Sequence, residues 1–97
     1  MPEYIYDRVG NAVGFVSNEM IYDMIGHAVG QLNGTHVHTL GGRYVGEYEG
    51  NRVVKGSGES PQDIQARKDP GGFGYPGNPG NREKAHGPAD AFDELLK

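Results

Sequence analysis

The chain contains no cysteine and no tryptophan. Without cysteine, neither a disulfide framework nor a thiolate zinc site can hold a small fold together. No apolar run is longer than a few residues, so we expect no membrane-spanning helix. The first residues also lack a basic stretch followed by an apolar one. We therefore expect no signal peptide and a cytoplasmic protein.

Basic charge is also scarce. Nine Lys and Arg residues stand against thirteen Asp and Glu residues, which gives a net charge of −4. A nucleic-acid-binding protein normally carries a basic face, so we exclude nucleic acid as the main partner. The chain has no nucleophile elbow, phosphate-binding loop, HExxH zinc motif or dinucleotide fingerprint. We expect no enzyme activity, no cofactor and no metal.

A sixteen-residue repeat fills the first half of the chain. It reads YIYDRVGNAVGFVSNE from Tyr4, MIYDMIGHAVGQLNGT from Met20, HVHTLGGRYVGEYEGN from His36 and a truncated RVVKGSG from Arg52. The copies align without a gap, and glycine recurs in two columns of the alignment. A fixed period of this kind indicates one supersecondary unit that needs its neighbours to bury its apolar side.

Each unit has the pattern of a β-hairpin. Residues 4–6 are aromatic and β-branched, residues 12–16 form a second such run, and an Asp-x-x-Gly turn separates them. We predict an all-β fold of four hairpin units around an axis, with residues 4–58 as the repeat domain. The second strand carries a repeated glycine, first at Gly14. A glycine in that place predicts a bulge, a bend or the close passage of another backbone.

The repeat also predicts the core. The positions expected to be buried are Ile5, Val13, Val16, Ile21, Val29, Leu32, Val37, Val45, Tyr48 and Val53. The hydrophobic free energy gained by burying these ten side chains is smaller than the conformational-entropy cost of ordering the repeat region. We therefore expect either a docked tail or self-association, through exposed hairpin edges or the C-terminus. A homo-oligomer is the first expectation, and another protein partner is the alternative.

The second half, residues 59–97, differs in composition and carries five of the six prolines. Ser60-Pro61-Gln62-Asp63 predicts the start of a short helix that runs to about Lys68. A Gly/Pro-rich stretch over 69–81, with Phe73 and Tyr75 as its anchors, predicts a linker or a docking strap. Residues 88–97 predict a short amphipathic helix that needs a surface to lie on. We expect this tail to dock on the repeat domain or on a neighbouring subunit.

Few residues qualify as a functional site. Tyr6, Tyr22, His36 and His38 occupy two columns in which flat side chains recur, and they are the candidate ligand-binding residues. His36 and His38 share a strand face, which is a spacing that can supply two metal ligands. The interpretation that we favour is an ordinary surface or packing role for these rings. Asp7 and Asp23 share one column, and we interpret them as turn caps rather than a catalytic pair.

The pattern [YM]-I-Y-D-x-x-G-x-A-V-G at this period resembles the 4-fold beta flower domain, a bacterial family of short repeated β-hairpins. The resemblance covers residues 4 to about 58 and implies four hairpins around an axis, without an activity. Three other patterns are similar in part. YD repeats form long arrays, choline-binding repeats use tryptophan, and Tyr44–Tyr48 resembles a single MORN repeat.

The chain is therefore interpreted as a non-catalytic structural or protein-interaction module. The alternative is a carbohydrate or cell-wall binding module that uses the Tyr and His surfaces.

Overall fold

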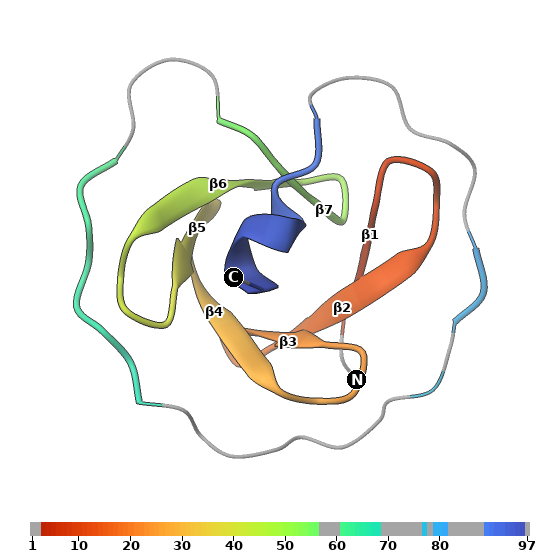
Figure 1. The fold of residues 1–97 in the computed structure, drawn as a ribbon, viewed down its shortest axis with the longest axis horizontal. Helices are drawn as coiled ribbons and strands as arrows, with labels where there is room; N and C mark the ends of the chain where they lie inside the picture. The colour runs from red at the N-terminus through yellow and green to blue at the C-terminus, as the bar shows by residue number, and fades with distance from the viewer. Residues whose placement is uncertain (1–2, 57–60, 69–76, 78, 82–88, 97) are drawn as a thin grey trace.

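The computed structural model describes residues 3–56, 61–68, 77, 79–81 and 89–96. Seven antiparallel strands follow one another as a meander, and each strand pairs with the next along the chain. The strands are β1 (Glu3–Tyr6), β2 (Ala12–Ser17), β3 (Met20–Asp23), β4 (Ala28–Asn33), β5 (His36–Thr39), β6 (Tyr44–Glu49) and β7 (Arg52–Val54), followed by the 3-10 helix η1 (Phe92–Leu96). Figure 1 shows the hairpins arranged around η1, which lies at the centre of the ring. The predicted all-β repeat of hairpins around an axis is confirmed.

Two kinds of turn alternate along the meander. Within the first three units, the turn after the first strand ends on a glycine with positive φ, which is 106° at Gly10, 90° at Gly26 and 97° at Gly42. Between the first two units, Ser17 pairs with Met20 across Asn18 and Glu19, whose φ angles are 51° and 65°. Two left-handed residues in a two-residue loop match the right-handed twist of the flanking strands. One kind of turn therefore closes each hairpin, and the other joins it to the next hairpin at the opposite end of the ring.

The repeated strand glycine lies at a bulge. Ile5 pairs with Gly14 while Tyr6 pairs with Ala12, so Val13 is the extra residue of the second strand. The same shift recurs in the second and third hairpins. A Cβ atom on Gly14 would collide with the backbone oxygen of Tyr22 in the next hairpin. The predicted bulge and close backbone approach are both confirmed.

The core lies along the axis of the ring. Ile5, Ile21, Val37 and Val53 occupy one column of the repeat, and each is at most 1% exposed. The other six positions predicted from the repeat pack against them as partly buried side chains. Ala91, Phe92 and Leu95 complete this cluster from the far end of the chain. Residues 89–96 therefore dock on the repeats and supply apolar surface that the repeats lack.

Residues 89–91 replace the missing strand of the truncated fourth unit. In the three complete units, the amide of the residue that opens the turn donates to the carbonyl four residues later, as Asp7 N does to Asn11 O at 2.8 Å. In the fourth unit, Lys55 N donates to Ala89 O at 3.0 Å. Val54 then pairs with Asp90, and Ala91 N donates to Val53 O at 3.0 Å. A distant segment thus completes the fourth hairpin with the register of the other three.

The ring is closed by the first strand and by Asp90. In each of the first two units, the carbonyl of the last residue accepts a hydrogen bond from an amide of the following unit. The last residue of the third unit is Asn51, and its carbonyl accepts instead the amide of Tyr6 in β1 at 2.8 Å. The carboxylate of Asp90 accepts Arg52 Nη2 at 2.6 Å and the backbone amide of Arg8 at 3.0 Å. One carboxylate therefore joins the first and last hairpins.

The end of the chain is a tighter helix than the amphipathic pattern predicts. Phe92 and Leu95 are buried inside the ring, whereas Leu96 is 57% exposed. A 3-10 helix has three residues per turn, so residues at i and i+3 share a face and the residue at i+4 turns away. The amphipathic helix expected over residues 88–97 would place Leu96 on the same face as Phe92 and Leu95, and this expectation is wrong. Pro88 and Lys97, at the predicted ends of this helix, lie outside the described residues.

Residues 61–68, which we call the strap, run along the outside of the second and third hairpins and have no regular secondary structure. The helix predicted from Ser60 to Lys68 is wrong over this range. Ile64 N donates to Gly42 O and Arg67 N to Leu40 O, both at 2.8 Å. A helix would use these amides internally, so hydrogen bonds to the sheet outweigh the local helix signals. Phe73 and Tyr75, the expected anchors of the Gly/Pro-rich stretch, lie outside the described residues.

Candidate functional site

A polar cluster on the outside of the ring centres on Glu47 of β6. Its Oε2 atom lies 2.7 Å from His36 Nδ1 and accepts a 2.8 Å hydrogen bond from the Tyr44 hydroxyl. Its Oε1 atom accepts the Thr35 hydroxyl at 3.0 Å. The repeat positions these groups because His36 of β5 pairs directly with Glu47 of β6. The carboxylate thus links two strands and the preceding turn.

These contacts shift two pKa values in opposite directions. Burial raises the pKa of Glu47, but the hydrogen bonds from His36, Tyr44 and Thr35 outweigh it, and the net pKa lies below the usual 4.5. Burial, together with the hydrogen bond and negative charge of Glu47, raises the pKa of Tyr44 to about 12. At neutral pH the carboxylate is therefore ionised and the phenol is neutral. Neither group is poised to transfer a proton near pH 7.

The four predicted ligand-binding residues do not converge on one surface. His38 is fully buried, and its Nε2 atom lies 3.3 Å from the strap carbonyl of Gln62. Both histidine rings contact Tyr44 edge to face, with ring centroids at 6.2 Å for His36 and 5.7 Å for His38. Tyr22 is buried and stacks on Phe15 at 5.0 Å in another part of the sheet. Tyr6 is half-buried on β1.

The two repeated aspartates form the turn caps that the sequence indicates. Asp7 Oδ1 accepts the backbone amides of Val9, Gly10 and Asn11 at 2.9–3.0 Å. Asp23 Oδ1 likewise accepts the amides of Ile25 and His27. An aspartate in this position satisfies amides that the tight turn leaves without a strand partner.

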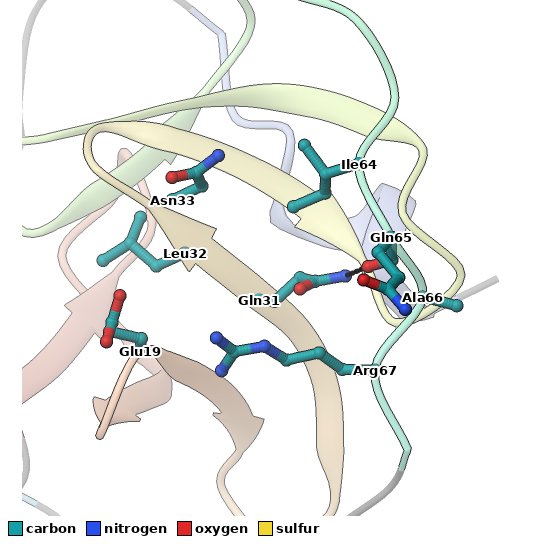
Figure 2. A pocket seen from close by; sticks show the side chains of 8 residues that line it. All are labelled: Glu19, Gln31, Leu32, Asn33, Ile64, Gln65, Ala66 and Arg67. Carbon is teal, nitrogen blue, oxygen red and sulfur yellow. Dashed lines mark hydrogen bonds between the residues drawn. The ribbon is translucent and has the colours of Figure 1, made fainter.

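A polar hollow of about 280 Å³ lies between β4 and the strap (Figure 2). Gln31 extends from β4 toward the strap, and its amide nitrogen donates to Gln65 O at 3.2 Å and to Thr39 O at 3.1 Å. Arg67 and Glu19 also line the hollow. Arg67 Nη1 lies 3.6 Å from the Met20 sulfur. The Gln31 amide binds the strap to the sheet, and the hollow is built around that contact.

A second hollow, which we call the acidic groove, opens beside η1. It lies at the end of the ring that carries the turns closed by Gly10, Gly26 and Gly42, which we call the turn end. It has a volume of about 600 Å³. Its apolar lining comes from Ala12, Val13, Met24, Phe92 and Leu96, and three carboxylates also line it, those of Asp7, Asp90 and Asp93. Asp7 and Asp90 hold parts of the fold together, as described above. Asp93 is exposed at the surface.

Two classes of site find no support in the part of the chain that the structure describes. There, no three His, Cys, Asp or Glu side chains gather closely enough to hold a metal ion. The described helical segment is also too short and too polar to cross a bilayer.

Sequence reasoning missed Gln31 and Glu47, although the repeat contains a signal for both. They occupy the same repeat column as Phe15. Across the neighbouring strand, Phe15 pairs with Tyr22, Gln31 with His38 and Glu47 with Val54. The pair between the first and second units is therefore aromatic, whereas the pair between the second and third units, Gln31 and His38, is polar. A change from aromatic to polar within a repeated column marks the place where the strap docks.

The chain matches the family model described as the 4-fold beta flower protein over residues 3–89. No curated protein matches it. No solved structure matches it either. The matched range extends beyond the repeats to Ala89, where the fourth hairpin is completed. Together with the ring of four hairpin units, the match shows that the chain belongs to the 4-fold beta flower family.

Proposed function

We propose that this protein is a non-catalytic module that binds another protein chain through the turn end of its ring. The supporting observation is the position of the exposed large apolar side chains among the described residues. These are Val9, Ile25 and Leu96, at 60%, 64% and 57% exposure. Val9 and Ile25 lie in the turns that contain Asp7 and Met24, which line the acidic groove together with Leu96. Apolar side chains gathered beside a groove are typical of protein-interaction surfaces.

The polar residues of the repeat favour a structural role over catalysis. Asp7 and Asp23 cap turns, Gln31 holds the strap, and Glu47 joins neighbouring strands. Each of these groups is used by the fold. A catalytic site would instead need a nucleophile or base that faces a pocket with a perturbed environment. The absence of cysteine fits a cytoplasmic setting for such a module.

The carbohydrate alternative has less support. Sugar binding needs aromatic faces exposed along a groove, whereas Tyr22 is buried against Phe15 and His38 is buried beneath the strap. Tyr44 is held between two histidines and Glu47. The tyrosine and histidine columns therefore contribute mainly to packing.

Affinity capture from a cell lysate, with the full chain and a Leu96→Asp variant as matched baits, tests the proposal. Because Leu96 is exposed, the variant should fold normally. The proposal expects a reproducible protein partner, a second copy of the chain included, that is retained by the wild type and lost with the variant. Retention of glycans, together with capture of the same proteins by both baits, would contradict it. A matched Glu49→Asp bait, changed at an exposed position in the two-residue-turn end of the ring, should behave as the wild type.

A further inference from the structure

Two hollows lie on opposite sides of the C-terminal segment at the turn end of the ring. The acidic groove lies beside the first hairpin and is lined by Ala12 and Val13. The other hollow has a volume of about 370 Å³ and is lined by Tyr44 and Val45, which occupy the same repeat columns in the third hairpin. In a ring of four units, the first and third units are half a turn apart. The two hollows are therefore copies of one feature related by a half-turn of the ring.

The two copies carry opposite charge. Asp7, Asp90 and Asp93 line the acidic groove, and the Arg52 guanidinium pairs with Asp90. The second hollow, which we call the basic hollow, is lined by Arg43, Lys55 and one carboxylate, Glu94. One face of the molecule thus has an acidic and a basic side, with the exposed apolar residues Val9, Ile25 and Leu96 around the acidic side.

We infer that the partner at this face is a second copy of the chain, packed turn end to turn end about a two-fold axis. This inference rests on the proposed function, because it names the partner for the same surface. A two-fold axis that lies in the interface, perpendicular to the line joining the hollows, exchanges their positions. The acidic groove of each copy then faces the basic hollow of the other. Such an isologous contact uses each complementary pair twice and closes at the dimer.

The two outer strands of the sheet are also partly covered, which disfavours assembly through strand edges. A free strand edge is the usual template for adding another chain to a sheet. Here the far edge of β7 pairs with residues 89–91, and Tyr6 of β1 bonds to Asn51. The predicted homo-oligomer is therefore assigned to the turn end, where apolar side chains and complementary charges coincide.

A charge-exchange experiment on the full chain tests this inference by sedimentation equilibrium. Asp93 and Lys55 are exposed and lie in the acidic groove and the basic hollow respectively. Asp93→Lys alone places like charges together at both contacts of the dimer, and so does Lys55→Glu alone. Each single variant should weaken dimerisation at least about tenfold, because two ion pairs become two repulsions. An equimolar mixture should recover the wild-type dissociation constant, because one heterodimer restores opposite charges at both contacts.

Two control variants carry the same changes of charge away from this face. Glu49→Lys lies at the two-residue-turn end of the third hairpin, and Lys68→Glu lies on the strap; both positions are exposed. They should leave the dissociation constant unchanged, and a mixture of the two should behave as each does alone. Circular dichroism of every variant confirms that the ring is folded before the dissociation constants are compared.

The outcomes separate this inference from the proposed function. A wild-type chain that stays monomeric up to hundreds of micromolar overturns the second copy as partner. A dimer that the single variants do not weaken, or that the mixture does not recover, overturns it as well. Capture of a different protein that depends on Leu96 would then support the proposed function without the homodimer. Loss of both self-association and Leu96-dependent capture would contradict both.

Discussion

The ring of Phe92 occupies the space that a side chain on Gly14 would need. A Cβ atom built on Gly14 would lie 2.7 Å from Phe92 Cζ, and one on Gly30 would lie 2.9 Å from Leu95 Cδ2. The third glycine of the column, Gly46, faces Ala91 in the same way at 3.4 Å. The repeated glycine therefore makes room for the C-terminal segment as well as for the neighbouring strand. The repeat and the tail are two parts of one core.

We expect Gly30→Ala to destabilise the protein by about 1–3 kcal/mol, because the added methyl group would meet the backbone oxygen of His38 at 2.8 Å as well as Leu95. Gly41→Ala is the matched control, since the nearest atom to its Cβ would be Thr39 Oγ1 at an ordinary 3.6 Å. Urea denaturation of both variants measures the difference. Equal midpoints for the two variants would show that the ring is not as tightly filled as described.

We expect Phe92→Ala to reduce the free energy of unfolding by about 3–5 kcal/mol, because the truncation leaves a cavity on the axis of the ring. Leu96→Ala, in the same helix but on an exposed side chain, should change it by less than about 0.5 kcal/mol. Both values come from urea titrations at one low protein concentration, so that self-association does not contribute. If the C-terminal segment only touched the surface of the ring, both substitutions would change the free energy of unfolding by small and similar amounts.

Acid should remove a stabilising contribution from Glu47. Its pKa is lower in the folded protein than the usual 4.5, so the ionised group stabilises the fold above that value. The contribution is lost as the pH falls below 4.5 and through the lowered pKa. We expect Glu47→Gln to be less stable than the wild type at pH 7, and the difference to shrink as the pH approaches 3. Urea midpoints across this range measure it, and a difference that stays constant with pH would contradict the assignment.

The sequence predicts the hairpins and their core because both follow from short-range patterns. The turn aspartates and the positive-φ glycines act within a few positions of one another, and the column of Ile5 and its copies is found from the sixteen-residue period. The closing strand does not. Residues 89–91 read Ala-Asp-Ala, which has little β-propensity. Their partner Val54 lies far along the chain, so no local signal connects them.

The strap and the candidate site illustrate the same limit. Ser-Pro-x-Asp is a sound local helix signal, but hydrogen bonds from Ile64 and Arg67 to the third hairpin decide the conformation. The sequence places His38 in a column of flat side chains and indicates it as a candidate ligand-binding residue. Its burial depends on the strap above it, and the repeat alone contains no information about that contact. Tertiary contacts between distant segments therefore determine the parts that sequence reasoning missed.

The most direct test of the closed ring is the hydrogen-exchange rate of the Lys55 amide. This amide donates to Ala89 O, in the place where Asp7, Asp23 and Thr39 donate within their own hairpins. We predict that NMR-detected exchange finds Lys55 protected to an extent similar to those three amides. Removal of residues 89–97 should then abolish its protection. Exchange of Lys55 at the rate of an unfolded chain in the full-length protein, with the other three amides protected, would contradict the completion of the fourth hairpin by the C-terminal segment.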